Sequence, residues 1–223
     1  MRIGISLSAP IMDQRLLSWG SRPSVSAITR PRPASGMMVV GGQPRTLPRL
    51  WLFTDHLRLP DPRASVAGLP RGKAGVVLRH DHDPARAALG RDLARICRAR
   101  RLLLVVAGDA RLAAALKAGV HLRGGRWPGP IRPQGVATSS AHSIQDMIRA
   151  RRAGAGLVFL SPAFPTASHA GAPGLGPLRW AAMARYAAPL PLAALGGVDG
   201  GSVKRLPSKL LRAVGAIGAL SAG

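Results

Sequence analysis

The sequence predicts an α/β protein built on a parallel β-sheet, and three features of the chain support this. Eight short apolar runs of strand length follow one another, segments with helical periodicity separate several of them, and most runs end at glycine or polar residues. Strands of a parallel sheet are buried on both faces, so they read as continuous apolar runs. The spacing alone suits either a closed barrel or a doubly wound open sheet.

The predicted strands lie in the part of the chain after residue 48. Aromatic residues make up only 4% of the chain, so the core is expected to consist mainly of Leu, Val, Ile and Ala. The eight runs are residues 50–54, 74–79, 102–106, 119–122, 135–139, 156–160, 191–195 and 213–217.

The helices are predicted from capping residues and apolar stripes. Asp83 and Pro84 open a helix whose stripe is Leu89, Leu93, Ile96 and Cys97. Asp109 caps a short helix, and no helix is expected before the fifth strand. Ser143 caps another, which directs Ile144, Met147 and Ile148 inward and stops at Gly154. Two further helices are expected over residues 177–187 and 202–210.

Residues 1–47 differ from the rest of the chain because they are rich in Arg, Ser and Pro and poor in acidic residues. We interpret them as a disordered or misassigned N-terminal extension, with Met37 or Met38 as the alternative start; an organellar transit peptide is the other interpretation. Residues 48–223 then form the folded domain. A chain that starts at Arg45 is therefore expected to melt at the temperature of the full chain.

Charge and cysteine content narrow the function classes. The net charge is +23, but nearly all cations are arginines scattered along the chain, which argues against nucleic acid as a partner and favours phosphorylated ligands.

The single cysteine, Cys97, has no internal disulfide partner and is expected to be a buried apolar residue. No apolar run is long enough to cross a bilayer, so a cytoplasmic protein is expected. The oligomeric state stays open.

Three blocks carry a resemblance to a known family. Residues 135–143 read GVATSSAHS, residues 154–169 read GAGLVFLSPAFPTASH, and residues 192–198 read LAALGGV. In this order and spacing they resemble the thiamine phosphate synthase/TenI family. The resemblance covers roughly residues 49–220. It implies a compact TIM (β/α)8 barrel, with its site in the loops that follow the strands.

The resemblance also implies a set of site residues. Gly196 and Gly197 would let backbone N–H groups approach the phosphate of a thiazole substrate. His142 and His169 would act as acid and base, because histidine titrates near neutral pH. The other implied ligand-binding residues are Arg79 and Ser140 on the pyrophosphate side and Thr166 and Ser168 on the thiazole side.

Three positions depart from the family pattern. Asp81 replaces a pyrophosphate-binding lysine, Arg126 replaces a magnesium-binding aspartate, and His169 replaces the lysine that closes the thiazole loop. We therefore expect no metal ligands and no cofactor, and a TenI-like tautomerase that acts on thiazole phosphate. The alternatives are a magnesium-dependent thiamine phosphate synthase, which condenses hydroxymethylpyrimidine pyrophosphate with thiazole phosphate, and a non-catalytic thiazole-phosphate binding protein.

Overall fold

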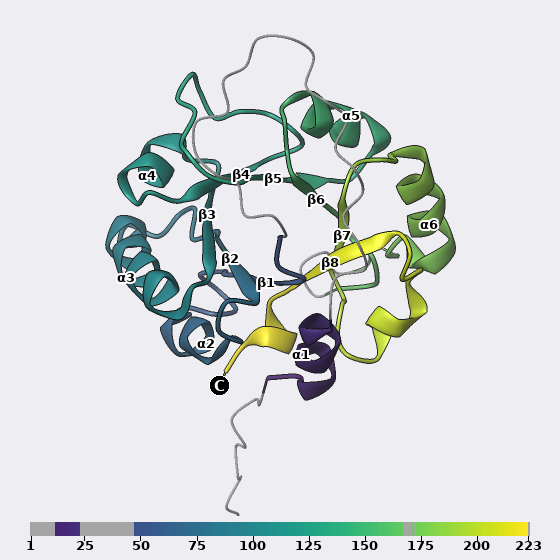
Figure 1. Cartoon of the computed structure of the whole chain (residues 1–223), viewed down its shortest axis with the longest axis horizontal. Helices are drawn as coiled ribbons and strands as arrows, with labels where there is room; N and C mark the ends of the chain where they lie inside the picture. The colour runs from purple at the N-terminus through teal and green to yellow at the C-terminus, as the bar shows by residue number, and fades with distance from the viewer. Residues whose placement is uncertain (1–11, 23–46, 167–170, 172, 223) are drawn as a thin grey trace, which may run out of the picture.

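A computed structural model describes residues 12–22, 47–166, 171 and 173–222 of the chain. Eight parallel strands form one closed barrel in sequence order, and Figure 1 looks along its axis. The fold class predicted from the sequence is thereby confirmed. The strands are β1 (Leu50–Phe53), β2 (Ala74–Leu78), β3 (Leu103–Ala107), β4 (Gly119–Leu122), β5 (Ala137–Ala141), β6 (Leu157–Leu160), β7 (Leu192–Leu195) and β8 (Leu211–Ala216).

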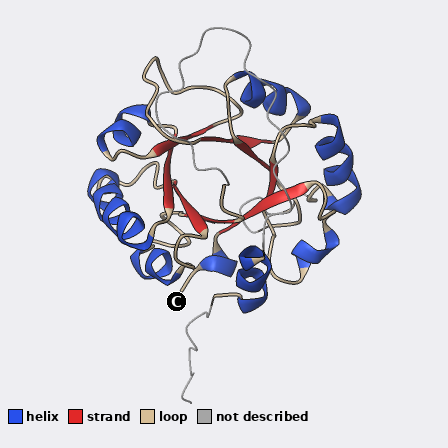
Figure 2. Cartoon of the chain, viewed as in Figure 1, coloured by secondary structure: helices blue, strands red, loops and turns tan. Residues whose placement is uncertain are grey.

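Helices surround the strands on the outside of the barrel, as Figure 2 shows. Among the helices of the described residues, none combines the length and the apolar character that a membrane span needs. The helices after β1 are α2 (Arg63–Gly68), α3 (Arg86–Arg100), α4 (Ala110–Ala115), α5 (Ile144–Arg152) and α6 (Gly176–Tyr186), with the 3-10 turns η2 (Ser202–Arg205) and η3 (Gly218–Leu220).

Several predicted helices need correction. The helix expected over residues 202–210 is only the turn η2, because Pro207 lacks an N–H and disfavours a helical residue before it. Helix α3 begins at Arg86, and Asp83 instead accepts a hydrogen bond from the Ala85 N–H in the preceding turn. Ile148 was predicted to face inward, but 39% of it is exposed.

Glycines beside Trp51 make room for aromatic rings inside the barrel. Trp51 on β1 pairs in register with Gly75 on β2 and with Gly215 on β8. A Cβ atom at position 75 would overlap the Trp51 ring, and one at position 215 would lie 2.7 Å from the Phe53 ring. Phe53 and Phe159 meet edge to face with centroids 4.8 Å apart, a favourable arrangement. Small residues therefore decide where large ones fit.

Helix α1 (Gln14–Ser21) lies on the outside of the barrel, next to the C-terminal turn η3 (Figure 1). Leu16 is fully buried, and the guanidinium carbon of Arg49 lies 4.2 Å from the ring centroid of Trp19. Asp13 caps α1 and also accepts a hydrogen bond from the Gly200 N–H, and its own N–H donates to the carbonyl of Ala219. The helix is thus attached to the loops that follow β7 and β8.

The prediction that the ordered domain starts near residue 48 is therefore wrong for residues 12–22. The acid-poor composition of residues 1–47 suggests disorder. One aspartate at the N-cap and two apolar residues on one helix face, Leu16 and Trp19, are nevertheless enough to form a helix where the barrel surface buries them. The rest of the N-terminal prediction falls on residues 1–11 and 23–46, outside the described residues.

We predict that Leu16→Ala lowers the free energy of unfolding by about 2–5 kcal/mol, because it leaves a cavity between α1 and the barrel. Urea unfolding followed by circular dichroism measures the change. Leu178→Ala on α6 is the matched control, since Leu178 is 87% exposed. Equal midpoints for the two variants would show that α1 contributes nothing to the stability of the barrel.

Candidate functional site

The candidate site lies at the end of the barrel where the strands terminate, because all eight parallel strands end on the same rim. In a closed ring of eight strands in sequence order, β3 lies opposite β7. The loops after β2, β3 and β4 therefore face the loops after β6, β7 and β8 across the mouth. The first side carries charged side chains, and the second carries glycines and hydroxyl groups.

The glycine side is built around Gly196 and Gly197, directly after β7. Both have positive φ values, +87° and +63°, which glycine adopts without strain. The loop after β6 is attached to them by backbone hydrogen bonds from Ala163 N–H to the carbonyl of Leu195 and from Phe164 N–H to the carbonyl of Gly196. The Ser202 hydroxyl donates to the carbonyl of Gly197. Within the described residues neither glycine N–H has an acceptor, which suits an anion at this rim.

His142 is the first residue after β5, where the sequence analysis expected it. Its backbone N–H donates to the carboxylate of Asp146 at 2.9 Å, and the backbone N–H of Asp146 donates to the hydroxyl of Ser143, the N-cap of α5. The His142 Nδ1 lies 2.9 Å from the carbonyl oxygen of Ser161. A carbonyl only accepts, so Nδ1 carries the hydrogen and Nε2 is the basic nitrogen.

The other predicted side chains are distributed around the rim. Ser140 lies within β5 rather than after it, because β5 runs to Ala141; its hydroxyl accepts from the Gly124 N–H at 3.4 Å. Thr166 is half-buried in the loop after β6. Ser168 and His169 lie outside the described residues, so their predicted roles stay predictions.

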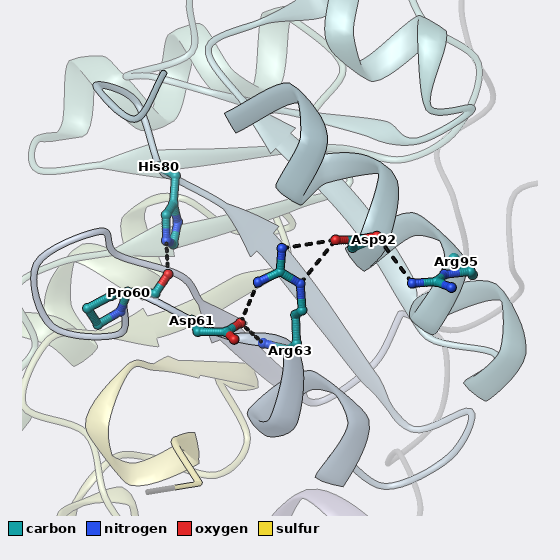
Figure 3. Close-up of polar contacts among 6 residues, drawn as sticks. All are labelled: Pro60, Asp61, Arg63, His80, Asp92 and Arg95. Atoms are coloured by element: carbon teal, nitrogen blue, oxygen red, sulfur yellow. Dashed lines mark hydrogen bonds and ion pairs between the residues drawn. The ribbon is translucent and has the colours of Figure 1, made fainter. Parts of the chain in front are cut away.

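Arg79 follows β2 and its side chain is 38% exposed, with its guanidinium 4.0 Å from the carboxylate of Asp55. The next residue, His80, is fully buried and its Nε2 faces the carbonyl of Pro60 at 3.3 Å (Figure 3). Its Nδ1 therefore accepts from the hydroxyl of Thr54, which itself accepts from the Arg79 N–H. Burial lowers the pKa of His80, so this histidine is a neutral residue that positions the backbone of Arg79.

Asp81, in the loop after β2, forms ion pairs with two arginines. Its Oδ2 lies 2.7 Å from Arg123 after β4, and its Oδ1 lies 3.4 Å from Arg86 on α3. Arg86 also donates to the carbonyl of Ala107 at 2.5 Å and lies 3.7 Å from Asp109, whose Oδ1 caps α4. Arg86 therefore occupies the space between the two carboxylates.

The sequence analysis did not predict a role for Arg86. A usable signal was present, because Arg86 is the first residue of α3 and a cation is unfavourable at a helix N-terminus. Such a residue indicates nearby carboxylates that compensate for it.

The magnesium ion that the resemblance implies for a synthase does not fit these residues. A hard cation needs accessible carboxylate oxygens. Asp81 Oδ2 is paired with Arg123 and Asp81 Oδ1 is buried beside Arg86, while Asp109 caps α4 and faces Arg86. In the described part of the chain, no group of three or more His, Cys, Asp or Glu residues could hold a metal ion.

His121 forms the floor of the mouth. It is fully enclosed, its Nδ1 lies 2.9 Å from the hydroxyl of Thr138, and its ring packs against Phe53 and Phe159. Burial, together with the positive charges of Arg79 and Arg123, lowers the pKa of His121 to about 3. Arg79, after β2, and Arg123, after β4, are therefore close enough to act electrostatically on His121 inside the barrel.

The architecture defines this protein as a (β/α)8-type barrel whose candidate site lies at the C-terminal rim of the strands. A family model described as thiamine monophosphate synthase matches residues 66–220. The chain belongs to this family, the thiamine phosphate synthase/TenI family of thiamine biosynthesis, as the resemblance predicted.

Individual relatives agree with this assignment. Thiamine-phosphate synthase from Halorhodospira halophila is 33% identical over 73% of this chain and 82% of that protein. The thiamine biosynthesis bifunctional protein ThiED from Geobacter sulfurreducens is 32% identical over 67% of this chain, which spans only 32% of that relative. Thiamine phosphate pyrophosphorylase from Pyrococcus furiosus shares the fold, with a TM-score of 0.64, 21% identity and coverage of 76% of this chain and 85% of that one.

We predict that Gly197→Ala weakens the binding of thiazole phosphate at least about tenfold, or ~1.4 kcal/mol. A Cβ atom here would overlap the carbonyl oxygen of Pro165 and displace the loop after β6. Calorimetry measures the dissociation constant. Gly72→Ala is the matched control, because Gly72 also has a positive φ, +70°, but nothing lies within 4 Å of the added atom. Equal affinity in both variants would place the phosphate elsewhere.

We also predict that the free energy of unfolding decreases as the pH falls below about 6.5. His121 and His80 have lowered pKa values in the folded chain, so the unfolded chain binds protons in this range that the folded chain does not. The loss approaches about 1.4 kcal/mol per pH unit for His121, and His80 acts in the same direction. Urea unfolding at pH 7, 5.5 and 4.5 measures it. His121→Phe should make the dependence shallower, and an unchanged slope would contradict the assignment.

Proposed function

We propose that this protein is a thiamine phosphate synthase, which joins thiazole phosphate to hydroxymethylpyrimidine diphosphate. The observation that carries the proposal is the presence of two anion-compatible regions on opposite sides of one mouth, the Gly196–Gly197 loop and the arginines after β2 and β4. Two phosphorylated substrates that must meet need such a pair. The names of the relatives support the same reaction.

In this proposal the thiazole phosphate lies against the loop after β7. The N–H groups of Gly196 and Gly197 are available to phosphate oxygens, and Thr166, from the neighbouring loop after β6, can donate its hydroxyl. Fixing the phosphate in this way orients the ring above the barrel axis. Such orientation lowers the entropic part of the barrier for a reaction between two substrates.

The diphosphate is the leaving group, and it gains negative charge as its bond to the pyrimidine methylene carbon breaks. Positive groups that already point at this charge stabilise the transition state. Arg79 and Arg123 are suited to the task because a guanidinium stays charged and offers several donors in one plane. Ser140, on the strand beside β4, can add a hydroxyl hydrogen bond.

A TenI-like tautomerase is the second candidate, and the engaged carboxylates of Asp81 and Asp109 favour it. That reaction needs one phosphate anchor and an acid/base residue but no diphosphate site. His142 suits this role because its Nδ1 is held by the carbonyl of Ser161 and its Nε2 is basic. His169 is the other acid/base residue that the sequence predicts.

Activity assays separate the two candidates. The purified full chain should form thiamine phosphate from thiazole phosphate and hydroxymethylpyrimidine diphosphate, detected as fluorescent thiochrome after oxidation. Absence of this product, together with isomerisation of the carboxythiazole phosphate, would replace the synthase with the tautomerase. Thiazole phosphate binding without either product would make the chain a non-catalytic binding protein.

We predict that His142→Ala lowers tautomerase turnover about 10²–10⁴-fold if that reaction is present, because a positioned acid/base group is lost. Binding of thiazole phosphate should be largely unchanged. His82→Ala, an exposed histidine after β2, is the control. Turnover within a factor of about two of the unmodified chain would assign proton transfer to another group.

A further inference from the structure

On the charged side of the mouth, the guanidinium of Arg86 lies between the carboxylates of Asp81 and Asp109. Arg86 is held at three points, by the carbonyl of Ala107 and by the carboxylates of Asp81 and Asp109. Its side chain is only 15% exposed. A divalent ion that bridged Asp81 and Asp109 would have to displace this buried guanidinium, which would then lose both of its ion pairs.

Arg123 is fixed at one end and open at the other. One terminal nitrogen is 2.7 Å from Asp81 Oδ2, while 58% of the side chain remains exposed to solvent. The guanidinium passes over Gly108, where an added Cβ atom would lie 2.9 Å from Arg123 Nε. Gly108 also has a φ of +65°, which favours glycine. Asp81 and Gly108 together therefore restrict the orientation of Arg123 and leave much of its side chain exposed.

Arg79 supplies a second cation from β2. Its contact with Asp55 is long, 4.0 Å, and Asp55 is already satisfied by the N–H groups of Leu57 and Arg58. The positive charges of Arg79 and Arg123 both act on His121 at the barrel axis. The ion pairs described on this side join four arginines, Arg58, Arg79, Arg86 and Arg123, to three carboxylates, Asp55, Asp81 and Asp109. Within these ion pairs the arginines outnumber the carboxylates.

From these contacts we infer that the β2–β4 side of the mouth binds a diphosphate group directly through Arg79 and Arg123, without a divalent cation. Asp81 and Arg86 are positioning residues that hold Arg123. The inference rests on the proposed synthase function, because a diphosphate substrate needs this subsite. The buried Arg86 lies between Asp81 and Asp109 and supplies a positive charge there without a metal ion.

The test is calorimetric binding of inorganic pyrophosphate to the full chain, in EDTA and again in excess magnesium. The dissociation constant in EDTA should equal or fall below the value in magnesium, since magnesium only competes for the anion. Arg123→Gln should weaken binding in EDTA about 10- to 100-fold, because a charged hydrogen-bonding partner is removed. Asp81→Asn should weaken it less, because the cation remains but loses its anchor.

Arg126→Gln is the matched control, since Arg126 lies in the same loop, is exposed and carries the same charge. Binding that requires magnesium would overturn the inference, as would equal losses for Arg123→Gln and Arg126→Gln. Thermal unfolding of each variant shows whether it folds. If Arg123→Gln does not fold, Arg123→Lys, which keeps the charge, replaces it.

Thiazole phosphate binding, measured in parallel, separates this inference from the proposed function. If the unmodified chain binds thiazole phosphate but does not bind pyrophosphate in EDTA, the metal-free diphosphate site is contradicted and the tautomerase remains. Metal-free pyrophosphate binding without thiamine phosphate formation supports the subsite and contradicts the synthase. Inorganic phosphate, as a third ligand, should bind more weakly than pyrophosphate, and equal affinity would mean that only one phosphate group is recognised.

Discussion

Closure of the sheet between β8 and β1 is the constraint on which the candidate site depends. The register of β1 with β2 and β8 places Trp51 between Gly75 and Gly215, so the largest interior ring lies where its neighbours have no side chains. Because the ring closes in sequence order, all strand ends share one rim and β3 faces β7. A glycine loop and an arginine cluster that are far apart in sequence thereby become two sides of one mouth.

The shortage of acidic residues governs the chemistry of that mouth. The chain has 32 basic residues and only 9 acidic ones, and at the rim each carboxylate already has a structural task. Asp55 accepts turn N–H groups, Asp109 caps α4, and Asp81 holds Arg123. Carboxylates that are engaged in this way stabilise arginines and are poor metal ligands. Asp81, where the family pattern has a lysine, therefore belongs to a charge network that includes Arg86 on α3 and Arg123 after β4.

Helix α1 connects the N-terminal segment to the candidate phosphate side of the mouth. Asp13 binds the Gly200 N–H in the loop after β7, and its own N–H binds Ala219 in η3 after β8. Gly200 is required for this approach, because a Cβ atom there would meet Asp13 at 2.6 Å. Part of the segment that composition separates from the barrel thus supports the loops beside Gly196 and Gly197.

The sequence by itself determined the strands, most capped helices and the family, because these depend on local signals. Apolar runs, the caps Asp109 and Ser143, and contiguous motifs need no knowledge of what lies across the barrel. It also located Arg79, His142, Gly196 and Gly197 at strand ends. Only the tertiary structure decided that Asp81 pairs with Arg123 and Arg86, that His80 and His121 are buried, and that α1 docks. These features join residues that are distant in sequence, and charge pairing and burial depend on distance in space.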